Sequence, residues 1–70
     1  MKREPVRSSV IAEIGYDPDM QLMEVRFRSG SVYRYGPVSG SLYTRFRTAP
    51  SLGRFFGGHI RDVVPYVQVS

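Results

Sequence analysis

The sequence predicts an α+β domain in which a three-stranded antiparallel meander is covered on one face by two short helices, in the order β-β-β-α-α. Apolar and polar residues alternate with a period of two between residues 8 and 35, which is typical of half-buried strands. Apolar residues then recur with helical spacing, and a serine that can cap a helix precedes each helical segment. Helices gathered on one face of an antiparallel sheet make an α+β architecture.

The composition indicates one small domain that is stabilised by its core alone. The chain has 70 residues and no cysteine, so neither a disulfide framework nor a thiolate metal site is available. No apolar run approaches the length of a membrane span, and no apolar signal segment follows the first residues. We therefore expect a monomeric cytoplasmic protein without a cofactor, metal ion or small-molecule substrate.

The first third of the chain predicts an extended arm followed by a strand. Residues 1–7 are polar and form the arm, and Ser8–Tyr16 forms the first strand, with Val10 among its inward-facing residues. Ile11 falls on the polar side of this strand, which indicates a β-bulge or a covered patch there. Asp17–Asp19 encloses a proline and predicts a turn, because aspartate side chains can bond to nearby backbone groups.

The next two strands, within residues 20–35, predict a β-hairpin with one apolar and one polar face. Treating Ser29–Ser31 as the loop keeps the apolar residues of both strands on the same side. This register places Phe27 opposite Tyr33 and Arg26 opposite Arg34. Like charges that face each other across a ladder are unfavourable, so we expect an anionic partner on this outer face.

Two short helices and an extended tail complete the predicted domain. Ser39 or Ser41 caps the first helix, Ser51 caps the second, and Gly57-Gly58 ends the second. Residues 63–69 form the tail. The first helix presents one apolar stripe, formed by Leu42, Phe46 and Ala49.

Several motifs, in this order, resemble the KTSC domain. The resemblance covers roughly nine tenths of the chain. The matching segments are Ser8-Ser9-x-Ile11, Ile14-Gly15-Tyr16-Asp17, Met23-x-Val25-x-Phe27, Gly30-x-x-Tyr33-x-Tyr35-x-x-Val38, and Ser51-x-Gly53-Arg54-Phe55-Phe56 leading into His59-Ile60-Arg61. The chain departs from the family pattern at Ser39, where proline is common, and at Gly57, where asparagine is common.

The KTSC resemblance implies a compact α+β fold and a binding role related to nucleic acids. The family is named for its occurrence at the C-terminus of some lysyl-tRNA synthetases, and it also forms small free-standing bacterial and phage proteins. The glycine at position 57 removes an amide side chain that the family commonly has there, together with any ligand contact that the amide makes.

The net positive charge of the chain favours an anionic partner. The chain has ten basic and six acidic residues, and nine of the ten basic residues are arginine, whose planar fork suits phosphates and carboxylates. An arginine-rich codon bias is the alternative explanation. The predicted partner-binding residues are Lys2, Arg3, Arg7, Arg26, Arg28, Arg34, Arg54, His59 and Arg61.

Two groups of these residues can also be explained by the fold alone, without a partner. On the outer sheet face, Glu13 and Glu24 can neutralise the arginines as ordinary cross-strand pairs. In the segment Ser51–Arg61, the phenylalanines and glycines also fit a core and a helix end. His59 is the only histidine, and no second base, phosphate loop or metal-ligand cluster accompanies it. We therefore expect no enzymatic activity.

The sequence as a whole predicts a non-catalytic binding module of the gene-expression machinery. In the preferred version, a small transcription regulator of the kind that phages encode docks on RNA polymerase, and its basic face lies along the nucleic acid. One alternative is direct binding of RNA or DNA. The other is a structural protein that oligomerises through a sheet edge.

Overall fold

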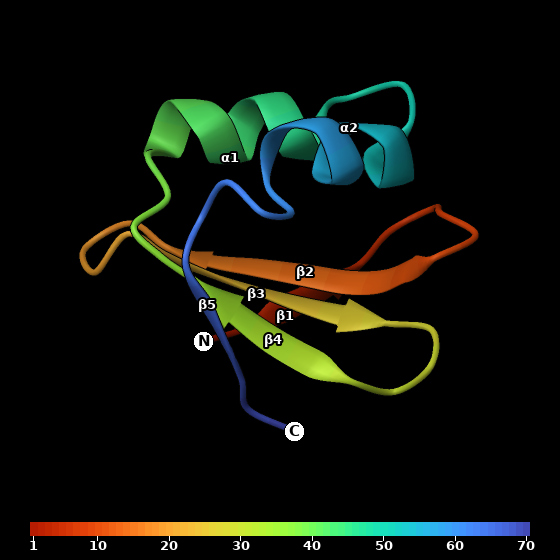
Figure 1. Cartoon of the computed structure of the whole chain (residues 1–70), viewed down its shortest axis with the longest axis horizontal. Coiled ribbons are helices and arrows are strands. Elements are labelled where there is room, and N and C mark those ends of the chain that lie inside the picture. The colour runs from red at the N-terminus through yellow and green to blue at the C-terminus, as the bar shows by residue number, and fades with distance from the viewer.

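The computed structural model describes residues 1–70 as a five-stranded antiparallel sheet with two helices on one face (Figure 1). The strands lie in the sheet in chain order. The predicted α+β class with two helices is therefore confirmed, whereas the three-stranded meander is wrong. The elements are β1 (Arg3–Pro5), β2 (Ile11–Asp17), β3 (Leu22–Phe27), β4 (Val32–Tyr35), α1 (Gly40–Arg47), α2 (Leu52–His59) and β5 (Tyr66–Gln68).

The two additional strands are the edges of the sheet. The predicted N-terminal arm contains β1, which pairs with β2, and the predicted tail contains β5, which pairs with β4. Each has only three residues, which is too short to show a periodic pattern. Each edge strand is therefore held in an extended conformation by its pairing with the neighbouring strand. Pro5 is tolerated in β1 because one side of an edge strand has no hydrogen-bonding partner.

The β3–β4 hairpin has its predicted faces but not its predicted register. The Phe27 N–H donates to the Ser31 carbonyl oxygen and the Gly30 N–H donates to the Phe27 carbonyl oxygen, both at 2.9 Å. The loop is therefore residues 28–30, and Gly30 ends it with a φ of 102°. Arg34 lies opposite Glu24, so the predicted pairing of Arg34 with an arginine is wrong.

A bulge in β2 explains the apolar residue on the polar side of the predicted strand. The pairing with β3 shifts register between Ile11 and Glu13, as expected from the break in the pattern. The bulge turns Ile11 into the core, where it is fully buried. Val10, which was predicted to face inward, instead precedes the strand and is 48% exposed.

Both helices begin at predicted caps. The Ser39 hydroxyl accepts a hydrogen bond from the Leu42 N–H at 3.1 Å, and the Ser51 hydroxyl accepts one from the Arg54 N–H at 3.3 Å. Each serine thereby satisfies an N–H group that has no partner within its helix.

The ends of the helices differ from the prediction. α1 stops at Arg47, so Ala49 lies beyond it. α2 continues through Gly57 and Gly58 to His59. Nothing lies within 4 Å of where a β-carbon would sit on either glycine, so neither marks a close approach of the backbone.

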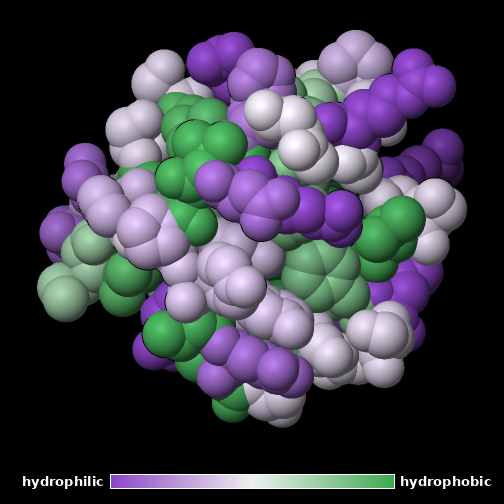
Figure 2. Space-filling model, in the orientation of Figure 1, coloured by the Kyte–Doolittle hydropathy of each residue, from purple (hydrophilic) through white to green (hydrophobic).

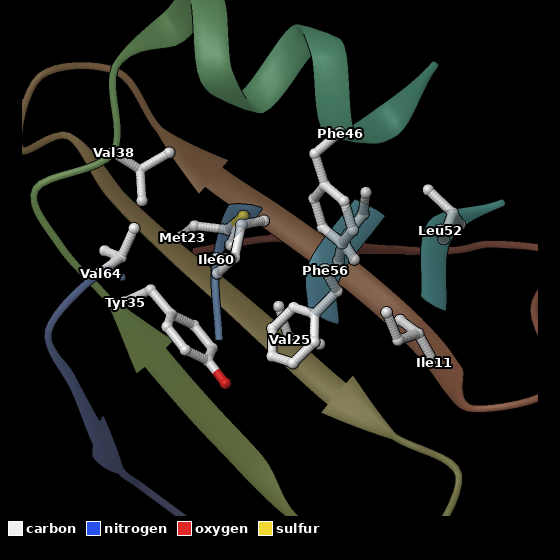
Figure 3. Close-up of a cluster of buried hydrophobic side chains, with 11 residues drawn as sticks. Ile11, Met23, Val25, Tyr35, Val38, Phe46, Leu52, Phe56, Ile60 and Val64 are labelled. Atoms are coloured by element: carbon white, nitrogen blue, oxygen red, sulfur yellow. The ribbon is translucent and has the colours of Figure 1, made fainter. Parts of the chain in front are cut away.

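The core lies between the sheet and the helices, and Figure 3 shows side chains from both layers meeting there. Phe46 extends from α1 and is fully buried. Neither helix has the combination of length and apolar character that crossing a membrane requires. The buried cluster consists of Ile11, Ile14, Met23, Val25, Tyr35, Val38, Phe46, Leu52, Phe56, Ile60 and Val64.

Candidate functional site

The outer face of the sheet, which points away from the helices, carries an ordered row of charges. Arg3 lies opposite Gly15, Gly15 opposite Glu24, and Glu24 opposite Arg34. Because Gly15 has no side chain, Arg3 can reach across β2 to the glutamate of β3. A β-carbon on Gly15 would lie 3.1 Å from the Arg3 Cγ, so the row depends on the glycine.

Two glutamates, one in this row and one in the neighbouring row, bind three arginines. Arg3 donates from Nη1 to Glu24 at 2.8 Å and from Nε to Glu13 at 3.2 Å. Arg34 donates from Nη2 to Glu24 at 2.6 Å, and Arg26 donates from Nε to Glu13 at 3.0 Å. Each glutamate therefore accepts hydrogen bonds from two arginines, which are the strong, charge-assisted kind.

The arginines keep both glutamates ionised. Hydrogen bonds from Arg26 and Arg3 lower the pKa of Glu13 below its ordinary value. Burial raises the pKa of Glu24, whose residue is only 5% exposed, but the hydrogen bonds from Arg34 and Arg3 outweigh that effect and the pKa is lowered. The predicted repulsion between arginines is thus absent, and these three guanidinium groups are already paired.

The other predicted partner-binding residues are spread over the molecule. Lys2 and Arg7 are exposed near the N-terminus, and Arg28 donates from Nε to the Ser8 carbonyl oxygen at 2.7 Å. Arg54 is exposed in the first turn of α2, on the other side of the sheet from the outer-face charges.

The positive charge of the protein is concentrated in the helical layer, defined here as residues 40–61. This segment contains four arginines, the single histidine and no acidic residue. The rest of the chain contains six basic and six acidic residues. The formal net charge of +4 therefore corresponds to the helical layer, whose arginines are Arg45, Arg47, Arg54 and Arg61.

Aromatic rings lie among these charges. Phe55 and His59 stack on α2 with ring centroids 4.3 Å apart, and the Arg45 guanidinium carbon from α1 lies 5.5 Å from the Phe55 centroid. Such a cation–π contact holds the guanidinium at the surface without an acidic partner. The predicted candidate His59 is thus exposed and has a ring, not a carboxylate, as its neighbour.

A groove opens beside the end of α2, between the helical layer and strands β3 to β5. It has a volume of about 370 Å³. We call it the aromatic groove. The face drawn in Figure 2 mixes hydrophilic and hydrophobic residues and has no continuous apolar surface. The residues that line the groove are Phe27, Ser29, Ser31, Tyr33, Tyr35, Phe56, Arg61, Asp62 and Tyr66.

The rings of the aromatic groove contact one another closely. Tyr33 lies 5.8 Å from Phe27 and 5.6 Å from Tyr66, and Tyr35 lies 5.5 Å from Phe56, between ring centroids. These separations are typical of packed aromatic pairs. The walls of the groove are therefore braced by their own contacts.

Polar groups of the aromatic groove have no partner within the protein. The hydroxyls of Tyr33, Tyr35 and Tyr66 neither donate nor accept a hydrogen bond, and no acidic group lies within ion-pair distance of Arg61. Burial, with smaller contributions from the two neighbouring tyrosines, raises the pKa of Tyr35 to about 12. This hydroxyl therefore stays protonated and can donate.

Sequence reasoning found one residue of the aromatic groove, Arg61, and missed its tyrosines as a site. Tyr33 and Tyr35 were predicted to point inward, which is correct for both. Tyr66 was placed in an unpaired tail, so its approach to them was not foreseeable. The chain contains no group of three potential metal ligands among histidine and acidic residues.

Comparison with known proteins shows similarity over nearly the whole chain. Residues 7–66 match the KTSC domain family. The crystal structure of a KTSC domain protein from Yersinia pestis is 39% identical, with a TM-score of 0.95 over 99% of this chain and 97% of that one. A protein from Stutzerimonas stutzeri is 45% identical over 56 residues, which are 80% of this chain and 79% of that protein.

A similar segment occurs in much longer proteins. The lysine–tRNA ligase of Nostoc punctiforme is 36% identical to this chain over 62 residues, which cover 89% of this chain and 11% of the ligase. The similarity therefore concerns a small part of the ligase.

Proposed function

This chain belongs to the KTSC domain family, as its motifs predicted, and from that premise we propose that it is a non-catalytic module that binds RNA through its helical layer. The observation that carries the proposal is the distribution of charge. The helical layer holds four arginines without an acidic residue, whereas the charges of the remaining chain balance. A surface with unpaired arginines attracts the phosphates of a nucleic acid.

The arrangement of the helical layer suits a phosphate backbone better than the outer sheet face does. Arg26 and Arg34 would have to leave a glutamate before they could bind a phosphate. Arg45 rests on a ring, and Arg54 makes no side-chain contact with an acid, so neither must give up an ion pair. Binding through the helices therefore costs less desolvation and rearrangement.

RNA is favoured over DNA by the longer relatives. A similar segment occurs in ligases whose name includes tRNA as a substrate, and in them it accounts for 11% of the chain. A small appended module that holds the RNA would serve such a protein. The partly buried Phe55 ring next to Arg45, and the exposed His59 ring that stacks on it, also suit the unstacked bases of single-stranded RNA.

A binding role is supported over catalysis by the surroundings of the histidine. His59 stacks on Phe55, and the helical layer contains no carboxylate that could act with it. General acid–base catalysis needs groups positioned on the atoms that exchange protons. Cleavage of RNA by the pure protein that is lost in His59→Ala would contradict this part of the proposal.

The test measures affinity for a fluorescein-labelled 12-nucleotide single-stranded RNA by anisotropy at low salt. Arg45→Glu with Arg54→Glu is expected to weaken binding by about tenfold or more, because two phosphate contacts are lost and two repulsive charges are added. The matched control combines Lys2→Glu with Arg7→Glu, which changes the formal charge equally but lies outside the helical layer.

The control variant is expected to stay within about threefold of the wild-type affinity at the same salt. Equal losses in both double variants would show that only net charge matters. Unchanged binding in the helical variant would place the RNA elsewhere. The same titration with a DNA oligomer compares the two nucleic acids directly.

Docking on RNA polymerase, the more specific role expected from the sequence, stays a prediction. A protein partner would remain bound after nuclease treatment, whereas a partner held through RNA would be released. Affinity purification from a host lysate, with and without nuclease, therefore separates the two roles.

A further inference from the structure

The aromatic groove has the size of a small-ligand site and lies next to the helical layer. Its volume of about 370 Å³ falls within the usual range of such pockets. Phe56 belongs to α2 and Arg61 follows that helix directly, and both line the groove. An RNA strand that lies on the helical layer can therefore continue past Arg61 into the groove.

The rings of the groove define the shape of a suitable ligand. Tyr66 is 57% exposed, and Tyr33 and Phe27 are partly buried, so part of each ring is accessible from the groove. Flat rings that are braced by one another favour a flat aromatic ligand, because its face can stack on theirs. A base released from its neighbours in single-stranded RNA has that shape.

The polar groups of the groove complement the edge of a base. The hydroxyls of Tyr33, Tyr35 and Tyr66 have no partner within the protein, and a hydroxyl can both donate and accept. Ser29 and Ser31 add two hydroxyls whose side chains make no hydrogen bond. These groups can therefore bond to the donors and acceptors on the edge of a base.

The charges at the rim limit the ligand further. The guanidinium carbon of Arg61 lies 5.7 Å from the Phe56 ring centroid, and Asp62 follows it with a φ of 62°. Residues other than glycine rarely adopt this left-handed backbone conformation, and aspartate is among those that adopt it most often. The Arg61 guanidinium can bind one phosphodiester, whereas the carboxylate of Asp62 at the same rim disfavours a free nucleotide with several phosphate charges.

We propose that the aromatic groove holds one unstacked base of a single-stranded RNA while Arg61 contacts the adjacent phosphate. The proposal rests on the proposed function, since the same RNA occupies the helical layer. It adds a site that reads bases to a surface that reads only the backbone.

The test compares two 12-nucleotide RNAs, one of uridines and one in which every base is absent. Both carry the same phosphates, so the backbone contacts of the helical layer are matched. The wild-type protein is expected to bind the uridine RNA about tenfold more tightly than the abasic RNA, because only the former can stack in the groove.

Variants of a groove tyrosine test whether the groove is responsible for the preference for uridine RNA over abasic RNA. Tyr66→Leu removes an exposed ring of the groove and is expected to lower the affinity for the uridine RNA to near that of the abasic RNA, without changing the latter. Tyr66→Phe keeps the ring and is expected to retain most of the preference. Tyr16→Leu is the control, because Tyr16 lies on β2, outside both the groove and the helical layer.

The outcomes for the groove and for the proposed function differ. If the wild-type protein binds both RNAs equally, the groove holds no base, although the helical layer still binds RNA. If Tyr66→Leu retains the full preference, the base lies elsewhere. If neither RNA binds, the proposed function fails, and the inference drawn from it fails as well.

Discussion

Replacing Gly15 by alanine is expected to displace β1, although alanine usually destabilises a strand less than glycine does. A β-carbon at this position would lie 2.5 Å from the Lys2 carbonyl oxygen and 3.2 Å from the Arg3 Cα. The first distance is far shorter than a normal contact, and its partner is backbone, so β1 as a whole has to move. The movement carries Arg3 away from Glu24.

The cost follows from what Glu24 loses. Its side chain is 7% exposed, and its Oε1 atom accepts from Arg3 while Oε2 accepts from Arg34. Without Arg3, one buried carboxylate oxygen lacks its donor, which costs about 1–3 kcal/mol. For a domain of this size each kcal/mol lowers the melting temperature by roughly 4–8 °C.

The assay is urea unfolding of Gly15→Ala in two backgrounds, the full chain and a chain that lacks residues 1–5. The family match begins at residue 7, so the truncation leaves the shared segment intact. In the full chain we expect a loss of about 1–3 kcal/mol in the free energy of unfolding. In the truncated chain no backbone opposes the methyl group, and we expect a gain of about 0.5 kcal/mol, because alanine loses less entropy than glycine on folding.

A reversal of sign between the two backgrounds is therefore the signature of the mechanism. The same loss in both would show that the methyl group clashes within the sheet and not with β1. No loss in the full chain would mean that β1 is not held over Gly15, and the route of Arg3 to Glu24 would have to be abandoned.

Two further predictions concern the core and the charge row. Phe46→Ala is expected to cost about 3–5 kcal/mol in chemical unfolding, because Phe46 is fully buried, whereas Phe27→Ala should cost less because Phe27 is only partly buried; equal costs would contradict the assigned core. The free energy of unfolding should fall as pH drops below about 4.5, because Glu13 and Glu24 have lowered pKa values in the folded protein and lose their ion pairs as they protonate. Glu24→Gln should flatten this acid dependence, and an unchanged slope would show that the row does not supply it.

Local features of the fold could be predicted from the sequence. Ser39 and Ser51 cap their helices because a cap needs only a side-chain oxygen and an N–H group a few residues away. Asp17 accepts hydrogen bonds from two nearby N–H groups in its turn for the same reason. The faces of β3 and β4 also follow from the alternation alone.

The hairpin register could not be obtained from that alternation. A slip of two residues returns every side chain to the same face, so the apolar pattern cannot tell the two registers apart. The turn decides between them, because Gly30 has a positive φ at the last position of a three-residue loop. The slip has electrostatic consequences, since it places Arg34 opposite a glutamate instead of an arginine.

Which charges are paired was decided by tertiary structure. Arg3 and Glu24 are 21 residues apart and meet only because β1 joins the sheet beside Gly15. The sequence could count ten basic residues, but it could not show that the arginines of the helical layer lack acidic partners.

The sequence by itself determined the three central strands and the two helices, where the helices begin, and that the chain is basic. The tertiary structure alone placed Tyr66 beside Tyr33 and thereby formed the aromatic groove. The physical reason is the return of the chain after α2, which adds β5 as an edge strand next to β4. A strand of three residues is too short for its alternation of apolar and polar residues to predict which strand it pairs with. Its extended conformation depends on its pairing with the neighbouring strand.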